Sequence, residues 1–191
     1  MARLVLMGDY FQTVVDLDAT ESGARAVADA GLAWLVGEGI VAAELTDCVL
    51  GAPLGHAPGP RWGEAVVEDG WKPSDGLKVI AGRTVFNAGQ GEPWWAMCPH
   101  CAVPVDLSAD TAWEPFRDAI ETWDDTGRAA VACSGCGRTG DLTAWAWSDN
   151  YFAFAWVGFE FWNWPEFRPD FLERFARALE GHRTVLVGGK L

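Results

Sequence analysis

The 191-residue sequence lacks the short motifs that mark common nucleotide-binding and hydrolytic sites. It contains no Gly-x-Gly-x-x-Gly, no phosphate-binding loop that opens a helix, no Gly-x-Ser-x-Gly and no His-Glu-x-x-His. We therefore assign no catalytic residue from the sequence. The sequence favours a binding role over an enzymatic one.

Long apolar runs are also missing. The longest strand-like stretch, residues 151–159, is about half of the roughly 20 residues that cross a bilayer. The short stretch from Met1 to Met7 is followed at once by Gly8-Asp9, which is too early for a signal peptide. With 50% hydrophobic residues, the chain is expected to be a globular cytoplasmic protein without a membrane partner. Eleven arginines against three lysines indicate a GC-rich bacterial genome.

Basic residues are scarce. The formal net charge is −13, and residues 98–149 carry three basic and nine acidic side chains. Nucleic-acid binding depends on cations that contact phosphates, and this stretch supplies only Arg117, Arg128 and Arg138. A nucleic-acid partner is therefore disfavoured. The acidic surface suits a basic protein partner, and the alternative is a solvated surface that only keeps the protein in solution.

What the chain does have is two Cys-x-x-Cys turns, Cys98 to Cys101 and Cys133 to Cys136. Each turn can aim both sulfurs at one ion, and two such turns together form a tetrahedral four-thiolate zinc site. Four sulfurs leave no position for water or substrate, so this zinc is expected to be structural. The alternatives are a redox pair, two disulfides, or an iron–sulfur cluster held by the same thiolates.

An apolar run precedes each cysteine pair, residues 94–97 and 129–132. Over residues 94–147 this pattern resembles a zinc ribbon, although the 31-residue gap between the pairs is longer than in a minimal ribbon and holds a helix-like segment at 111–124. The cysteine pairs, the Phe-Trp-Asn-Trp-Pro stretch at 161–165 and the Gly-His-Arg…Gly-Lys-Leu ending also resemble a family of uncharacterised bacterial proteins. That resemblance implies no activity.

Two strand–helix–strand units bracket the cysteines. Helices are predicted at 20–36 and 169–180, and strands at 4–7, 11–17, 40–50, 77–80, 83–86, 151–161 and 184–187. This order predicts an α+β fold: a ferredoxin-like open sheet with two main helices and an inserted zinc-ribbon module. Residues 1–93 and 148–191 are the expected halves of the α+β domain, and residues 94–147 are the module.

Tryptophan is concentrated near the module, with nine of twelve residues between Trp94 and Trp164. Alternation along residues 152–157 predicts a buried strand, with its large side chains (Phe152, Phe154, Trp156) on one face and its small ones (Ala153, Ala155, Val157) on the other. Trp162 and Trp164 follow this strand. They are candidates for an exposed interface, and the alternative is a staple that seals the last helix onto the sheet.

Residues 51–63 form a stretch with four glycines and three prolines, which predicts a long loop. The stretch carries His56, Arg61 and Trp62, which are further candidates for an interface, and it follows Asp47 and Cys48. An enzymatic or ligand-sensing role would require His56, Asp47 and Arg61 to converge in a pocket. Their spacing matches no catalytic motif, and Cys48 lies between apolar residues, where a thiol is usually inert.

Three functions follow from these observations. The leading prediction is a zinc-stabilised protein-binding module, an adaptor or immunity-type protein, that recognises a macromolecule through an acidic, aromatic surface. The second is an enzyme or small-ligand sensor that uses the loop at 51–63. The third is a nucleic-acid-binding zinc ribbon.

Overall fold

A computed structural model describes residues 8–50, 54–68 and 70–191. Its main feature is a six-stranded sheet with the order β11-β1-β10-β4-β3-β2, in which neighbouring strands are all antiparallel. The strands are β1 (Tyr10–Asp16), β2 (Val41–Thr46), β3 (Gly55–Pro58), β4 (Leu77–Asn87), β10 (Phe152–Trp162) and β11 (Thr184–Lys190). The predicted strand at 4–7 lies outside the described residues, and the two strands predicted at 77–80 and 83–86 form one continuous β4.

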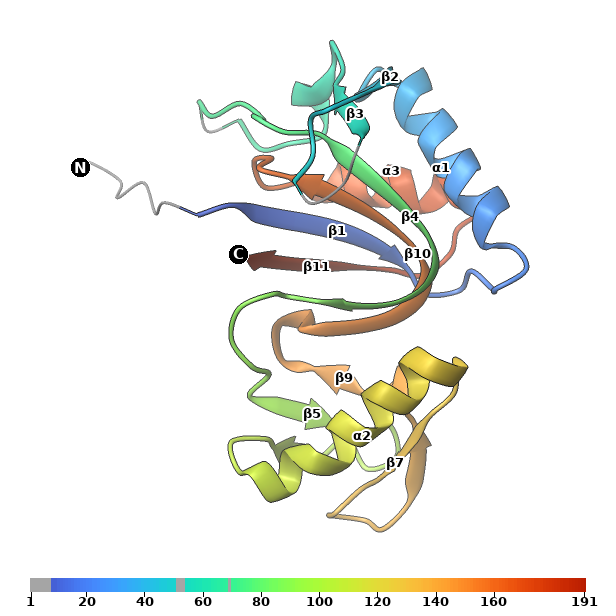
Figure 1. Cartoon of the computed structure of the whole chain (residues 1–191), viewed down its shortest axis with the longest axis vertical. Helices are drawn as coiled ribbons and strands as arrows, with labels where there is room; N and C mark the ends of the chain where they lie inside the picture. Colours follow the sequence, from blue (N-terminus) through green and yellow to red (C-terminus); the bar gives the residue numbers. More distant parts are fainter. Residues whose placement is uncertain (1–7, 51–53, 69) are drawn as a thin grey trace, which may run out of the picture.

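Two helices cover one face of this sheet. Helix α1 (Ala24–Gly37) begins four residues later than predicted, because Glu21 to Gly23 form a turn in which Thr20 Oγ1 accepts a hydrogen bond from the Gly23 N–H. Helix α3 (Pro169–Ala178) begins at a proline, as predicted. Both helices pack into one core with the sheet, and the Trp34 ring of α1 stacks on Phe175 of α3 at 5.4 Å between centroids. Figure 1 shows the two helices side by side on the sheet.

The alternation of side chains between the two faces of the sheet changes partway along β10. Ala153 and Ala155 lie in a cluster on the face away from the helices, whereas Phe154 packs with the cysteine-bearing part of the chain. A register shift between Ala155 and Val157 then places Val157, Phe159 and Phe161 under α1 and α3. The predicted sharing of one face by Ala153, Ala155 and Val157 is therefore wrong at Val157. The pairing with β4 shifts register here, with Gly82 and Arg83 of β4 opposite Trp156 alone, and the alternation along β10 reverses.

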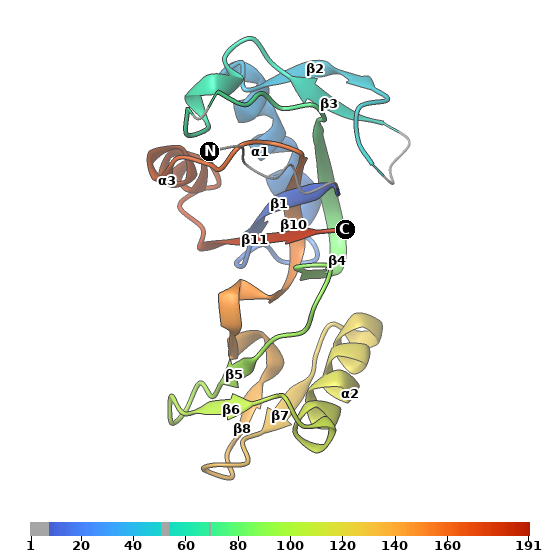
Figure 2. The same ribbon diagram turned by 90° about the vertical axis from the view of Figure 1, so that its left-hand side faces the viewer.

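Residues 94–147, hereafter the four-cysteine segment, form a separate set of elements between β4 and β10. Strands β5 (Trp95–Met97), β6 (Pro104–Asp106) and β9 (Ala146–Trp147) form one small sheet, and β7 (Ala130–Ala132) pairs with β8 (Thr139–Asp141). Helix α2 (Asp110–Thr126) lies where a helix was predicted and ends at Gly127, which has a φ of 74°. Figure 2 shows these elements at one end of the long axis, with α1 and α3 at the other.

The four-cysteine segment has its own apolar core. The buried face of α2 (Phe116, Ala119 and Trp123) packs against Trp145 and Trp147. It also packs against the start of β10, at Phe152 and Phe154. The Trp123 ring meets Phe154 edge-on at 5.3 Å between centroids. No helix in the described part of the chain is long and apolar enough to span a bilayer.

Candidate metal centre

The two Cys-x-x-Cys turns share one backbone geometry. In the first, the Cys98 carbonyl accepts the Ala102 N–H at 3.0 Å and the Cys98 N–H donates to the Val103 carbonyl at 3.2 Å. In the second, the equivalent bonds join Cys133 to Gly137 at 2.8 Å and to Arg138 at 2.9 Å. Strands β5 and β7 lead into these turns, as predicted from the apolar runs before each pair.

The repeated geometry needs a left-handed residue after each second cysteine. Ala102 has a φ of 54° and Gly137 a φ of 72°. Glycine adopts positive φ without strain, so Gly137 suits this position. Ala102 suits it less well, because side chains with a Cβ disfavour this conformation.

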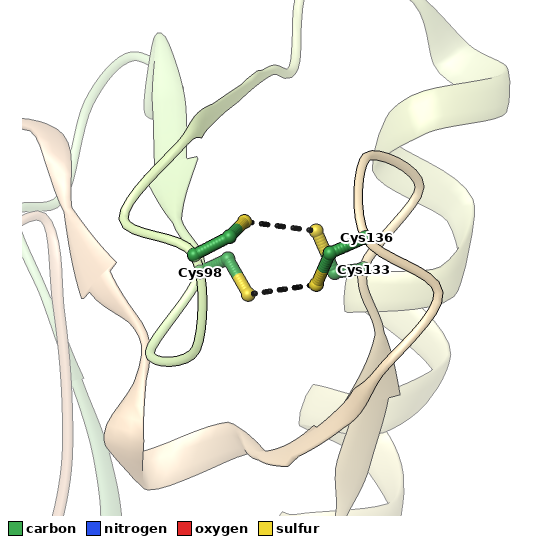
Figure 3. Close-up of side chains that lie close together, drawn as sticks. Cys98, Cys133 and Cys136 are labelled. Carbon is green, nitrogen blue, oxygen red and sulfur yellow. Dashed lines mark hydrogen bonds between the residues drawn. The ribbon is translucent and has the colours of Figure 1, made fainter.

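The four sulfurs lie close enough to share one ion. All four are within 4.8 Å of one another, and the Sγ–Sγ distance is 3.9 Å both for Cys98 with Cys136 and for Cys101 with Cys133. A tetrahedral ion with metal–sulfur bonds of about 2.3 Å requires sulfurs about 3.8 Å apart. Figure 3 shows the two turns facing each other across these contacts. All five cysteines of the chain are free thiols, so the disulfide alternative does not describe this structure.

The turns prepare one sulfur to be a thiolate. Burial opposes ionisation of Cys98, but the N–H groups of Cys101 and His100 stabilise its anion and bring its pKa down to about 6. The hydrogen bond from the Val103 backbone favours the Cys101 thiolate, yet burial and the neighbouring sulfurs outweigh it and raise the pKa of Cys101 to about 11. A cation among the sulfurs would favour ionisation of the Cys101 thiol, which is the electrostatic effect of a bound metal.

The side chain of His100 takes no part in the sulfur cluster, although its backbone N–H donates to Cys98 Sγ. Its ring Nε2 lies 2.9 Å from the Thr139 carbonyl, so the side chain joins the first turn to β8. Cys98 and Cys133 are buried in the core of the four-cysteine segment, whereas Cys136 is exposed. The centre thus stands at the edge of a packed core, where loss of the ion would disconnect the two turns.

Comparison of the chain with known proteins found no match. No protein-family model, curated protein or solved structure matches this chain. The resemblance to a zinc ribbon therefore depends on the four cysteines and the local geometry of the two turns. These residues are positioned to bind a metal ion, and the donor set suits zinc or iron.

The predicted aromatic interface at residues 162–164 is buried. Trp164 is fully buried and its Nε1 donates to the Asp75 carbonyl at 2.9 Å, and only 6% of Trp162 is exposed. Asn163 between them binds Asp9 and Asp75 through its side-chain amide at 2.9 and 2.8 Å. The interpretation as an exposed corner is therefore wrong, and the alternative of a staple describes Trp164, which shares a buried core with Phe171 of α3. The polar contacts of Asn163 hold the corner against the start of β1 and the segment before β4.

The predicted loop at 51–63 is partly regular. Residues 51–53 lie outside the description, but β3 occupies 55–58 and pairs with β2. His56 is buried with Nδ1 3.0 Å from the Ala42 carbonyl, whereas Arg61 is exposed and forms two hydrogen bonds to Glu64 at 2.8 and 2.7 Å. Trp62 packs at the margin of the helical core. His56 and Arg61 thus have separate partners and do not form a common site.

The sequence analysis did not single out the most exposed aromatic residue of the four-cysteine segment. Trp94 is 75% exposed, and Val103 on the first cysteine turn is 50% exposed. The analysis treated Trp94 only as part of the apolar run that enters the turn. Its exposure follows from its place just before β5, where its backbone N–H donates to Ser148 Oγ and its ring points outward.

Proposed function

We propose that this chain is a zinc-stabilised binding protein whose four-cysteine segment recognises a basic macromolecular partner, as an adaptor or a toxin-neutralising immunity protein does. The observation that carries the proposal is an acidic stripe along α2. Zinc is the proposed ion, because it is the common occupant of closed four-cysteine sites. Free thiols suit a reducing compartment, so we place the protein in the cytoplasm of a bacterium.

The acidic stripe consists of five exposed carboxylates that recur every three or four residues along α2: Asp110, Glu114, Asp118, Glu121 and Asp125. This spacing places them on one face of the helix, opposite the buried Phe116, Ala119 and Trp123. The helix carries one basic residue, Arg117, which lies 3.9 Å from Glu114 and from Asp118. At these exposed positions the ion pairs are weak and leave most of the negative charge available.

Charge of one sign along a helix attracts partners of the opposite sign and raises association rates. The same stripe repels phosphate backbones, which argues against the nucleic-acid function. Exposed Trp94 belongs to the same segment and supplies an aromatic residue of the kind that dominates protein interfaces. The second candidate, an enzyme that uses the loop at 51–63, loses support because His56 and Arg61 are engaged separately.

We also infer that the sheet and its two helices form a ferredoxin-like domain into which residues 94–147 are inserted. The support is the succession β1-α1-β4-β10-α3-β11, the order β11-β1-β10-β4, and the packing of both helices on one face. The β2-β3 hairpin then extends the sheet at one edge. The insertion joins β4 to β10 and projects the acidic helix away from the domain.

The test is to isolate the chain from its host under gentle conditions, identify co-purifying molecules by mass spectrometry, and measure the affinity of the recovered partner. The informative variant is Glu114→Gln with Asp118→Asn and Glu121→Gln. Its matched control changes three exposed glutamates outside the four-cysteine segment to glutamine, Glu166, Glu173 and Glu180, and so alters the net charge equally.

The expected result is a stoichiometric basic protein that binds the wild type and the control equally and the stripe variant at least about tenfold more weakly, with a steep salt dependence. Equal binding by the stripe variant and the control would refute the acidic helix as the recognition surface. Co-purification of nucleic acid in place of protein would favour the third function.

A further inference from the structure

The face of the sheet opposite α1 and α3 carries a polar row across three strands. Thr13 of β1 lies directly opposite Glu160 of β10, which lies directly opposite Lys78 of β4. Directly opposed residues of antiparallel strands point to the same face. Val14, Phe159 and Val79 pack with the helices, so their neighbours in the row point the other way.

Two apolar groups flank this row. On one side the rings of Phe11 and Trp162 lie 5.3 Å apart in a cluster with Val49. On the other side Ile80 and Phe86 belong to a second cluster. Between them the face is hollow, with a volume of about 370 Å³ lined by both groups and by all three residues of the polar row. This size lies in the range of small-molecule sites.

Gly158 makes room for Phe86, one of the side chains that line the hollow. It lies opposite Val15 and Ile80 in the middle of the sheet, and a Cβ at this position would be 2.3 Å from the Phe86 ring. The missing side chain lets the Phe86 ring approach the backbone of the strand closely. An aromatic wall thereby stands beside the polar row.

Two side chains of the polar row, Thr13 and Glu160, can form further hydrogen bonds. Thr13 is 1% exposed and lines the hollow, yet its Oγ1 has no hydrogen-bond partner among the described residues. Glu160 is 15% exposed, accepts a hydrogen bond from Trp162 Nε1 at 2.9 Å, and has Lys78 Nζ at 3.8 Å from the same oxygen, Oε1. A buried hydroxyl without a partner lowers stability, so its presence in a lined hollow points to a ligand that completes it.

We propose that this hollow binds an uncharged small molecule with an aromatic ring and a hydroxyl group. The carboxylate of Glu160 and the ammonium of Lys78 offset each other, which disfavours a charged ligand. A hydroxyl can accept a hydrogen bond from Thr13 Oγ1 while donating one to Glu160, because it has one donor and two acceptor positions. The ring then lies between Phe11 with Trp162 and Ile80 with Phe86, where offset stacking is favourable.

The test compares para-propylphenol with its methyl ether, para-propylanisole, by calorimetry and by the shift of the Trp162 Nε1 signal in amide NMR spectra of the full chain. The ether cannot donate to Glu160, so it should bind about tenfold more weakly than the phenol. Glu160→Gln should weaken the phenol more than the ether, whereas Thr13→Val should weaken both. Glu64→Gln, an exposed carboxylate outside the hollow, is the control and should change neither.

Two further readouts separate binding from folding. Thr13→Val should leave the melting temperature unchanged or raise it, because it removes a buried hydroxyl that has no partner. Ile80→Trp should fill the hollow and abolish binding of both compounds while the chain stays folded. The proposal is overturned if neither compound binds at millimolar concentration, or if both bind the wild type and the Ile80→Trp variant alike.

Discussion

Two residues of opposite character occupy the same backbone position in the cysteine turns. Ala102 and Gly137 are both left-handed, and each donates its N–H to the carbonyl of the first cysteine of its turn. A Cβ added to Gly137 would meet no atom within 4 Å. The difference between alanine and glycine here is therefore one of backbone conformation and not of packing.

Exchanging these residue types should shift stability in opposite directions. We expect Ala102→Gly to stabilise the metal-bound protein by about 0.5–1 kcal/mol, because it removes left-handed strain that exceeds the entropy lost by glycine. Gly137→Ala should destabilise it by about 1 kcal/mol. Urea unfolding of the two variants with metal bound measures both effects, and a destabilising Ala102→Gly would contradict the shared geometry.

At the scale of elements, a metal ion bound by the four cysteines would join pieces of structure that hold together weakly by themselves. Strands β5, β7, β8 and β9 have only two or three residues each. Strands this short are not stable alone. Coordination of one ion by both turns supplies about 10–16 kcal/mol in small zinc modules, which exceeds what the remaining contacts of such strands provide.

Removal of the metal should therefore unfold the four-cysteine segment. Chelation or Cys133→Ser is expected to abolish near-ultraviolet dichroism from Trp145 and Trp147 and to expose the segment to protease. The control is Cys48→Ser, because Cys48 is the fifth cysteine and lies outside the cluster. Metal analysis of the wild type should find one zinc per chain, and an unchanged melting temperature in Cys133→Ser would contradict the structural role.

The affinity for the metal should also rise with pH between about 6 and 8. Because the pKa of Cys101 is raised to about 11, its proton must be displaced on binding throughout this range, and protons compete more strongly as pH falls. The depressed pKa of Cys98, about 6, makes it the first sulfur ready to bind. Competition titrations with a chelator at several pH values measure this slope, and a flat profile would contradict it.

The elements show how far the sequence could predict the structure. The α3 helix and the two cysteine turns were predicted because their signals are local: an N-terminal proline, an apolar stripe, a Cys-x-x-Cys spacing. The register shift between β10 and β4 was missed because it depends on a distant partner strand. For Trp162 and Trp164 the sequence left an exposed interface and a buried staple both open, because the contacts that decide between them are distant as well. The Asn163 amide that fixes the corner binds Asp9 and Asp75, which are 154 and 88 residues away. Composition made residues 55–58 look like a loop, but pairing with β2 makes them a strand.

At the scale of the whole molecule, β4 and β10 enter and leave the four-cysteine segment as paired neighbours. Asn87 lies directly opposite Phe152, and the Ala88 N–H donates to the Tyr151 carbonyl at 3.0 Å. The chain therefore departs from the sheet and returns to it at one place. A two-residue hairpin turn could close this gap, since paired residues of antiparallel strands are the usual flanks of such turns.

Replacing residues 88–151 by Asn-Gly should leave a sheet that folds without metal. Phe152 and Phe154 would be exposed by the excision, so both are changed to threonine in the same chain. We expect cooperative thermal unfolding and retained packing of α1 on α3, measured by circular dichroism and the Trp34 signal. An unfolded product would mean that the sheet depends on the four-cysteine segment and that the division into domain and insertion is wrong.

Strand β10 contributes to two cores, and the register shift in its pairing with β4 lies between the two contributions. Phe152 and Phe154 contact the four-cysteine segment, whereas Val157, Phe159 and Phe161 contact the helices. The two halves of one strand therefore have different packing partners. In a lineage that lost its cysteines, the first half would be free to drift toward polar residues while the second half stayed apolar, and the boundary between drift and constancy would fall at Trp156.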